Sequence, residues 1–132
     1  MYNTANVGIA AVIENNEGKV LLGLRKSKLG DLTWGYPGGK LEKGEEIETC
    51  ITREVEETGM NLKGMNFLGI TNDVFEDGNH FITIYMKSND IEGVPERIEP
   101  DKCLEWKYFS YDELPDNLFL PVKNWLRGKR YI

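Results

Sequence analysis

The sequence predicts a mixed β-sheet sandwiched by helices, in a single domain that spans residues 1–132. Two observations favour this fold class: segments with strand character outnumber helical ones, and one long helix lies in the middle of the chain. A third observation is the length of the chain, because 132 residues suit one domain and fall short of two. A composition of 40% hydrophobic and 29% charged residues supports a sizeable core and excludes disordered, collagen-like and coiled-coil chains.

The first half of the chain predicts two strands, an extended piece and the long helix. Residues 7–13 and 20–25 have strand character, and the polar turn between them predicts a hairpin. Residues 34–39 form a short extended piece interrupted by turn residues. A helix is expected over 46–58, with Gly59 as its C-terminal cap.

The second half predicts more strands and a short final helix. Residues 65–74 and 80–87 are strands joined by a Glu-Asp-Gly-Asn turn, which is a strong hairpin signal. Residues 88–101 are polar and are expected to be a loop, and 104–109 another strand. A helix over 121–126 begins at Pro121, since proline is favoured in the first helical turn.

Charge and hydropathy exclude several protein classes. The net charge of −6 argues against stable nucleic-acid binding, which requires clustered lysine and arginine. The apolar runs are too short to span a membrane, and the first residues lack signal-peptide character. Cys50 and Cys103 are expected to be reduced thiols in a cytoplasmic protein. A phosphorylated ligand would need local neutralisation by a metal ion or a few cations.

The chemically informative segment is the predicted central helix with the Gly38-Gly39 turn before it. On a helical wheel its apolar face contains Ile47, Cys50, Ile51, Val55 and Thr58. Glu54 lies within that face, where a carboxylate is costly unless a cation pairs with it. Glu57 stands one turn further on, beside Glu54. Two such carboxylates near exposed glycine carbonyls suit a hard divalent cation such as Mg²⁺.

At these residues the sequence resembles the Nudix hydrolase family. Its signature spacing is matched by Gly39, Glu45, Arg53, Glu54 and Val55. The resemblance implies an α/β/α sandwich with a mixed β-sheet and one central catalytic helix. It also implies hydrolysis of a nucleoside diphosphate linked to another moiety, with Mg²⁺ or Mn²⁺ as the cofactor and attack of water on one phosphorus of the pyrophosphate bridge.

The resemblance also implies roles for individual residues. Glu54, Glu57 and the Gly38 carbonyl would ligate the metal, and Arg53 would orient a carboxylate through a charge-assisted pair. Glu45 has two interpretations, a charge at the helix N-terminus or a supporting residue and base. The expected substrate-binding residues are Arg25, Trp34, Gly39, Lys40, His80 and Phe81. Phe75 and Tyr85 are further candidates for stacking on a base, and the alternative for each aromatic residue is a place in the core.

The match departs from the family pattern at the end of the helix, where the chain is one residue short. Glu57 occupies the position three residues after Glu54, and Thr58 stands where the family has its next acid. The site is therefore expected to bind fewer ions or to use an acid from elsewhere. Glu99, Asp101 and Glu105 are the candidates for that acid.

Outside the helix, residues 79–84, 99–106 and 112–115 are similar to a subgroup of nucleoside triphosphate diphosphatases. This similarity implies conversion of a (d)NTP to a (d)NMP and pyrophosphate, with a nucleotide as the only expected small-molecule partner and a homodimer as an option. Two alternatives stay open. The protein could hydrolyse nucleotide sugars or dinucleoside polyphosphates, or it could bind nucleotides without turnover because of the shortened helix.

Overall fold

We describe a computed structural model of the chain, which covers residues 4–88, 90–96 and 98–132. The strands are β1 (Asn6–Val12), β2 (Val20–Arg25), β3 (Trp34–Gly35), β4 (Gly38–Lys40), β5 (Asn61–Leu62), β6 (Met65–Val74), β7 (His80–Ser88), β8 (Ile91–Glu92) and β9 (Cys103–Phe109), and the helices are α1 (Ile47–Glu56) and α2 (Leu120–Leu126).

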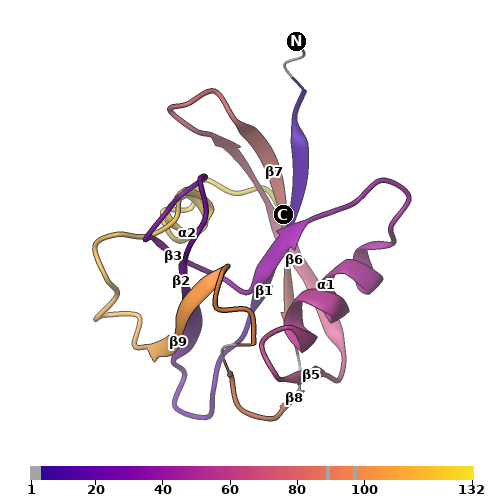
Figure 1. The fold of residues 1–132 in the computed structure, drawn as a ribbon, viewed down its shortest axis with the longest axis vertical. Coiled ribbons are helices and arrows are strands. Elements are labelled where there is room, and N and C mark those ends of the chain that lie inside the picture. Colours follow the sequence, from indigo (N-terminus) through magenta and orange to yellow (C-terminus); the bar gives the residue numbers. More distant parts are fainter. Residues whose placement is uncertain (1–3, 89, 97) are drawn as a thin grey trace.

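The centre of the fold is a four-stranded mixed sheet in the order β4-β1-β7-β6. Strands β1 and β7 are parallel, and the other two pairings are antiparallel. A three-stranded antiparallel sheet, β3-β2-β9, lies beside it, and β5 pairs with β8. Figure 1 shows α1 and α2 on opposite sides of the mixed sheet. The predicted fold class, a mixed sheet between helices, is confirmed.

Alternation along β1 explains the two layers of core. Ile9, Ala11 and Ile13 point to the side where α1 contributes Cys50, Ile51 and Val55 to a buried cluster. Ala10 and Val12 point the other way, into a second cluster that includes Val122 and Trp125 of α2. Successive strand residues face opposite sides of a sheet, so an uninterrupted apolar run marks a strand covered on both faces.

The hairpin predicted for the first two strands is wrong. Strand β1 pairs with β4 and β7, whereas β2 pairs with β3 and β9 in the neighbouring sheet. Only the base of the turn is closed, by the bridge Glu14–Val20 and by Leu21 N donating to Ile13 O at 2.9 Å. Both strands are buried along most of their length, and each has a neighbour on either side, with the distant strands β7 and β9 among them.

The helices are close to their predicted positions. Helix α1 ends at Glu56 with Glu57 as its C-cap, two residues before the predicted end, and Gly59 follows with φ +95°. That left-handed conformation suits glycine and turns the chain away from the helix axis. The predicted loop 88–101 contains the short strand β8. In the described residues, none of the helices has the length and hydropathy needed to cross a membrane.

Candidate active site

Two adjoining pockets meet along β4. The acidic pocket, of about 650 Å³, is lined by Glu54 of α1, by Glu57 at the C-cap of this helix, and by Glu99 and Lys102 of the segment before β9. The aromatic pocket, of about 260 Å³, is lined by Phe75, Phe81, Thr83 and Phe119 among others. Six residues line both, and these are Arg25, Ser27, Tyr36, Gly38, Gly39 and Lys40. A single ligand can therefore contact both pockets at once.

The two glycines of β4 are required by close packing on either side. A Cβ atom on Gly38 would lie 2.0 Å from the carbonyl oxygen of Ile9 in the neighbouring strand. A Cβ atom on Gly39 would lie 2.6 Å from the carboxyl group of Glu54. Gly38 therefore has no room for a side chain against the backbone of β1, and a side chain at Gly39 would displace the Glu54 carboxylate. The Gly-Gly pair thus brings backbone and carboxylate oxygens together at the edge of the acidic pocket.

Arg53 fixes the orientation of the helix carboxylates. Its Nη1 pairs with Glu45, and its Nη2 lies 3.3 Å from Oε2 of Glu54. Glu45 also accepts a hydrogen bond from the backbone amide of Glu42 at 3.0 Å. That amide and the Arg53 guanidinium hold the pKa of Glu45 below its usual range. Glu45 is not among the residues that line either pocket, which favours a supporting role for it.

Glu57 is the most perturbed carboxyl group of the site. Burial, the nearby charges of Glu54 and Glu99, and a hydrogen bond with Glu99 together raise the pKa of Glu57 to about 7. The backbone oxygen of Glu99 accepts hydrogen bonds from the amides of Lys102 and Cys103 at 2.9 and 3.1 Å, which forms a tight turn. Within that turn Nζ of Lys102 pairs with Glu99 at 3.2 Å. The turn therefore presents Glu99 to the end of α1.

The donor set of the acidic pocket fits a hard divalent cation. Four carboxyl groups line this pocket, those of Glu42, Glu54, Glu57 and Glu99. The charges of Glu54 and Glu99 act on Glu57, and a cation would relieve that repulsion. In the described part of the chain, no three acidic, histidine or cysteine side chains already converge as a closed ligand cluster. The fit rests on donor chemistry and on the crowding of negative charge.

The structure narrows the choice of the additional acid. Thr58, at the position of the acid that the helix lacks, is buried and its hydroxyl donates to Val55 O at 2.6 Å, away from the acidic pocket. Asp101 and Glu105 are exposed and lie outside the linings of both pockets. Of the three candidates named from the sequence, Glu99 is the one that reaches the site.

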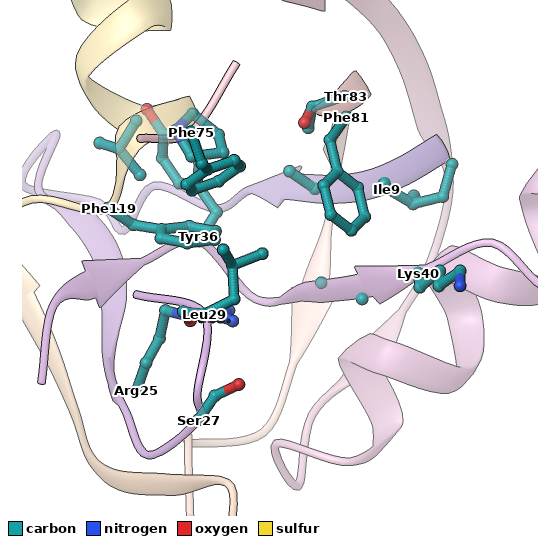
Figure 2. Close-up of a pocket in the computed structure, with 16 residues that line it drawn as sticks. Ile9, Arg25, Ser27, Leu29, Tyr36, Lys40, Phe75, Phe81, Thr83 and Phe119 are labelled. Atoms are coloured by element: carbon teal, nitrogen blue, oxygen red, sulfur yellow. Dashed lines mark hydrogen bonds between the residues drawn. The ribbon is translucent and has the colours of Figure 1, made fainter. Parts of the chain in front are cut away.

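The aromatic pocket has walls from the β6–β7 hairpin and from the distant segment before α2. Phe75 follows β6, Phe81 lies on β7 and Phe119 precedes α2, and Figure 2 shows Phe81 and Phe119 approaching the pocket from different sides. The Phe75 ring lies 6.2 Å from that of Phe81 and 5.5 Å from that of Phe119, centroid to centroid. Aromatic walls of this kind favour a flat apolar ring as the ligand.

Arg25 holds the wall between the two pockets. Its guanidinium lies 3.9 Å from the centre of the Phe119 ring. Its Nε and Nη2 donate to Leu29 O at 3.3 and 3.0 Å. Burial lowers the pKa of Arg25 from its usual value. Part of the guanidinium is therefore used in structural contacts. Because Arg25 lines both pockets, it is also placed to contact a phosphate group of a bound ligand.

The structure brings together most of the substrate residues expected from the sequence. Arg25, Gly39, Lys40 and Phe81 line the pockets. Trp34 instead packs edge-on against Phe109, with ring centroids 4.9 Å apart, and His80 contacts Asn72. Neither of these two residues is on the lining of either pocket.

Sequence reasoning missed several pocket residues, chiefly Tyr36, Thr83, Lys102 and Phe119. Phe119 carried a weak signal, because it is an aromatic residue directly before a predicted helix. Tyr85, a candidate for base stacking, belongs to the core, where its ring stacks on Trp125 at 4.4 Å.

Comparisons with known proteins agree with this geometry. The NUDIX domain model matches residues 4–128. The chain is 28% identical over 141 residues to an oxidized purine nucleoside triphosphate hydrolase of Danio rerio, with 100% of this chain and 86% of that protein covered. It is 31% identical to an ADP-ribose pyrophosphatase of Methanocaldococcus jannaschii over 98% of this chain and 78% of that protein. A crystal structure of a MutT NUDIX hydrolase from Burkholderia pseudomallei matches with a TM-score of 0.81 and 31% identity, over 87% of this chain and 90% of that one.

Proposed function

The chain belongs to the NUDIX family, and on that premise we propose that it converts a (d)NTP to a (d)NMP and pyrophosphate with Mg²⁺ or Mn²⁺. The family and relatives with such names indicate that the chain is a Nudix pyrophosphohydrolase of nucleoside phosphates. The proposal adds the substrate class, the products and the metal.

The observation that carries this proposal is the shared wall of the two pockets. An aromatic pocket that holds the base leaves the phosphate chain at Gly38, Gly39 and Lys40, which also line the acidic pocket. There the carboxylates Glu54, Glu57 and Glu99 would hold the divalent cation together with the Gly38 carbonyl. When bound, the cation neutralises phosphoryl oxygens and lowers the pKa of water.

The remaining residues support that arrangement. The Nη2 atom of Arg53 pairs with the Glu54 carboxylate and keeps it turned toward β4. Lys40 and Arg25 supply positive charge beside the phosphates, which a protein of net charge −6 must provide locally. Glu45 acts through Arg53, because that guanidinium is its ion-pair partner.

A second candidate function is hydrolysis of a nucleoside diphosphate sugar. The relative from Methanocaldococcus jannaschii is named an ADP-ribose pyrophosphatase, and it matches nearly the whole chain. The relative from Danio rerio is named for oxidized purine nucleoside triphosphates and also covers the whole chain, which supports the triphosphate class.

We also propose that residues 1–132 act as one domain in the cytoplasm, where Cys50 and Cys103 would be reduced thiols. A homodimer stays a prediction.

The test is a hydrolysis panel with Mg²⁺ and with Mn²⁺. It includes ribo- and deoxyribonucleoside triphosphates, nucleotide sugars such as ADP-ribose, and dinucleoside polyphosphates, and the products are identified by chromatography. We expect a nucleoside monophosphate and pyrophosphate from one or a few triphosphates. Preferred cleavage of a nucleotide sugar would select the second candidate. Nucleotide binding without any product would contradict the enzyme assignment and favour a binding module.

A further inference from the structure

A buried carboxylate lies directly behind the aromatic pocket. Asp73 of β6 has no exposed surface. Its Oδ2 accepts hydrogen bonds from the hydroxyls of Thr83 at 2.6 Å and Thr71 at 3.1 Å, and its Oδ1 accepts one from Nδ2 of Asn124 at 2.8 Å. No ion pair found within the described residues includes Asp73. Only neutral donors therefore stabilise this buried carboxylate. The loss of any one of these hydrogen bonds is expected to be costly.

This arrangement fixes the direction of the Thr83 hydroxyl. A threonine hydroxyl has one proton to donate and lone pairs to accept with. Because a carboxylate can only accept, the proton of Thr83 points at Asp73. The Thr83 oxygen then offers lone pairs as acceptors, toward the Tyr85 hydroxyl in the core and toward the pocket, and the negative charge behind it strengthens that character.

The Thr83 oxygen is within reach of a ligand in the aromatic pocket. Thr83 is on the lining of this pocket, two residues from Phe81 on the same face of β7, as Figure 2 shows. Gly8 is the register partner of Thr83 on the parallel strand β1. A Cβ atom on Gly8 would lie 3.5 Å from Oγ1 of Thr83 and 3.6 Å from Phe81. Thr83 is only 5% exposed, and the missing side chain at Gly8 leaves its hydroxyl on the lining of the pocket.

We propose that Thr83, oriented by Asp73, makes the aromatic pocket selective for a base that presents an N–H donor, such as an exocyclic amino group. This inference rests on the proposed function, because it takes the ring in the pocket to be that of a nucleotide. A base that presents no donor at this point leaves the pocket-facing lone pair of Thr83 unused, and a carbonyl oxygen there faces the charge of Asp73. Thr83 is the contact residue, and Asp73 is a positioning residue.

The test compares substrates that differ only in the donor. We would measure kcat/KM for ATP against purine riboside triphosphate, and for CTP against the triphosphate of pyrimidin-2-one riboside. Each second member lacks the amino group and gains no other donor. We expect the wild type to favour the amino member by about tenfold in the pair it hydrolyses faster. Equal rates within both pairs would overturn the proposal.

Three variants assign the effect to the hydroxyl and its orientation. Thr83→Val removes the acceptor and is expected to bring the ratio to near one, and Thr83→Ser is expected to restore it. In Asp73→Asn, Asn124 still requires an acceptor at Oδ1, so the new amide nitrogen faces Thr83 and donates to it. The Thr83 proton then points into the pocket, and the preference is expected to fall to one or below.

Thr49→Val, on the exposed part of α1, is the matched control and should keep the wild-type ratio. Because the readout is a ratio within one variant, loss of folded protein lowers both rates and leaves it unchanged. A wild-type ratio in both Thr83→Val and Asp73→Asn would contradict the proposal.

Binding of adenosine and of purine riboside, followed by NMR, separates the two possible failures. Suppose that no triphosphate is hydrolysed, that adenosine binds more tightly than purine riboside, and that Thr83→Val removes this difference. The proposed function then fails and this inference holds. If neither nucleoside binds, or both bind equally, the inference fails whatever the hydrolysis panel shows.

Discussion

The acidic and aromatic pockets share a wall but are built in different ways. One continuous segment of the acidic pocket, from Gly38 to Glu57, holds the glycine turn that leads into α1 and Arg53, which holds Glu54 in place. The rest of its lining comes from residues 23–36 and 99–106. The aromatic pocket takes its rings from residues that are 38 positions apart, Phe81 and Phe119, and its Thr83 oxygen depends on Asp73 of another strand. Apart from Glu99, the parts expected to perform chemistry are local in sequence, whereas the parts expected to select the base are assembled by tertiary packing.

This difference suggests a division of labour that substitutions can test. Changes in the acidic pocket should lower turnover and metal binding. Changes in the aromatic pocket should weaken binding of the base and alter the choice of substrate. A variant of one pocket that behaves like a variant of the other would break the comparison.

The largest effect is expected from Glu54→Gln. It keeps the shape of the side chain but removes the charge beside Gly39, so we expect Mg²⁺-dependent kcat to fall roughly 10³-fold, because metal charge stabilisation is worth several kcal/mol. Glu56→Gln on the exposed side of the same helix is the control. Circular dichroism should show both variants folded. Retention of most activity by Glu54→Gln would remove this residue from the metal site.

A smaller effect is expected from Glu99→Gln. We expect this variant to need a roughly 10–100-fold higher Mg²⁺ concentration for the half-maximal rate. Glu99 completes a set of three carboxylates that the shortened helix cannot supply alone. Asp101→Asn is the matched control, since Asp101 is exposed and outside the pocket. If Asp101→Asn lost as much as Glu99→Gln, Glu99 would have no special part in the site.

Phe81→Leu should raise KM about fivefold and change kcat little, because an aromatic contact is worth about 1 kcal/mol beyond apolar burial. Phe67→Leu is the control, as Phe67 is 56% exposed on β6 and lies outside both pockets. Steady-state kinetics on the preferred nucleotide measures both constants. A fall in kcat with constant KM would place Phe81 among the groups that act on the phosphates.

The smallest effect is a pH dependence of stability without metal. The pKa of Glu57 is about 7 in the folded protein against an ordinary value of 4.5, so the folded state binds the extra proton. The unfolding free energy is therefore expected to fall as pH rises from about 4.5 to about 7, and to stay lower above that range. Mg²⁺ should stabilise more at pH 8 than at pH 5.

Urea unfolding with EDTA or Mg²⁺ at both pH values measures this effect. Glu57→Gln should reduce the difference between them. Equal stabilisation by Mg²⁺ at pH 5 and at pH 8 would contradict a role for the Glu57 carboxyl group.

The fold and the acidic pocket could be predicted because their signals are periodic and local. The apolar face of α1 and the spacing of Arg53 and Glu54 can be read within one helix. The pairing of β1 with β7 could not, because an apolar run identifies a buried strand but not its neighbour. Tyr36 and Thr83 were missed for a related reason, since a tyrosine or threonine in a strand has no local mark of facing a pocket.

Chemical-shift mapping by NMR on the ¹⁵N-labelled protein tests the central claim most directly. A nucleoside would be titrated in EDTA, and Mg²⁺ would be titrated separately. We expect the nucleoside to shift the amides of Gly8, Phe81 and Thr83 and to leave that of Glu57 in place, while Mg²⁺ shifts Glu54, Glu57 and Glu99. Nucleoside shifts that concentrate on the acidic pocket, or Mg²⁺ shifts that avoid it, would contradict the division between a metal pocket and a base pocket.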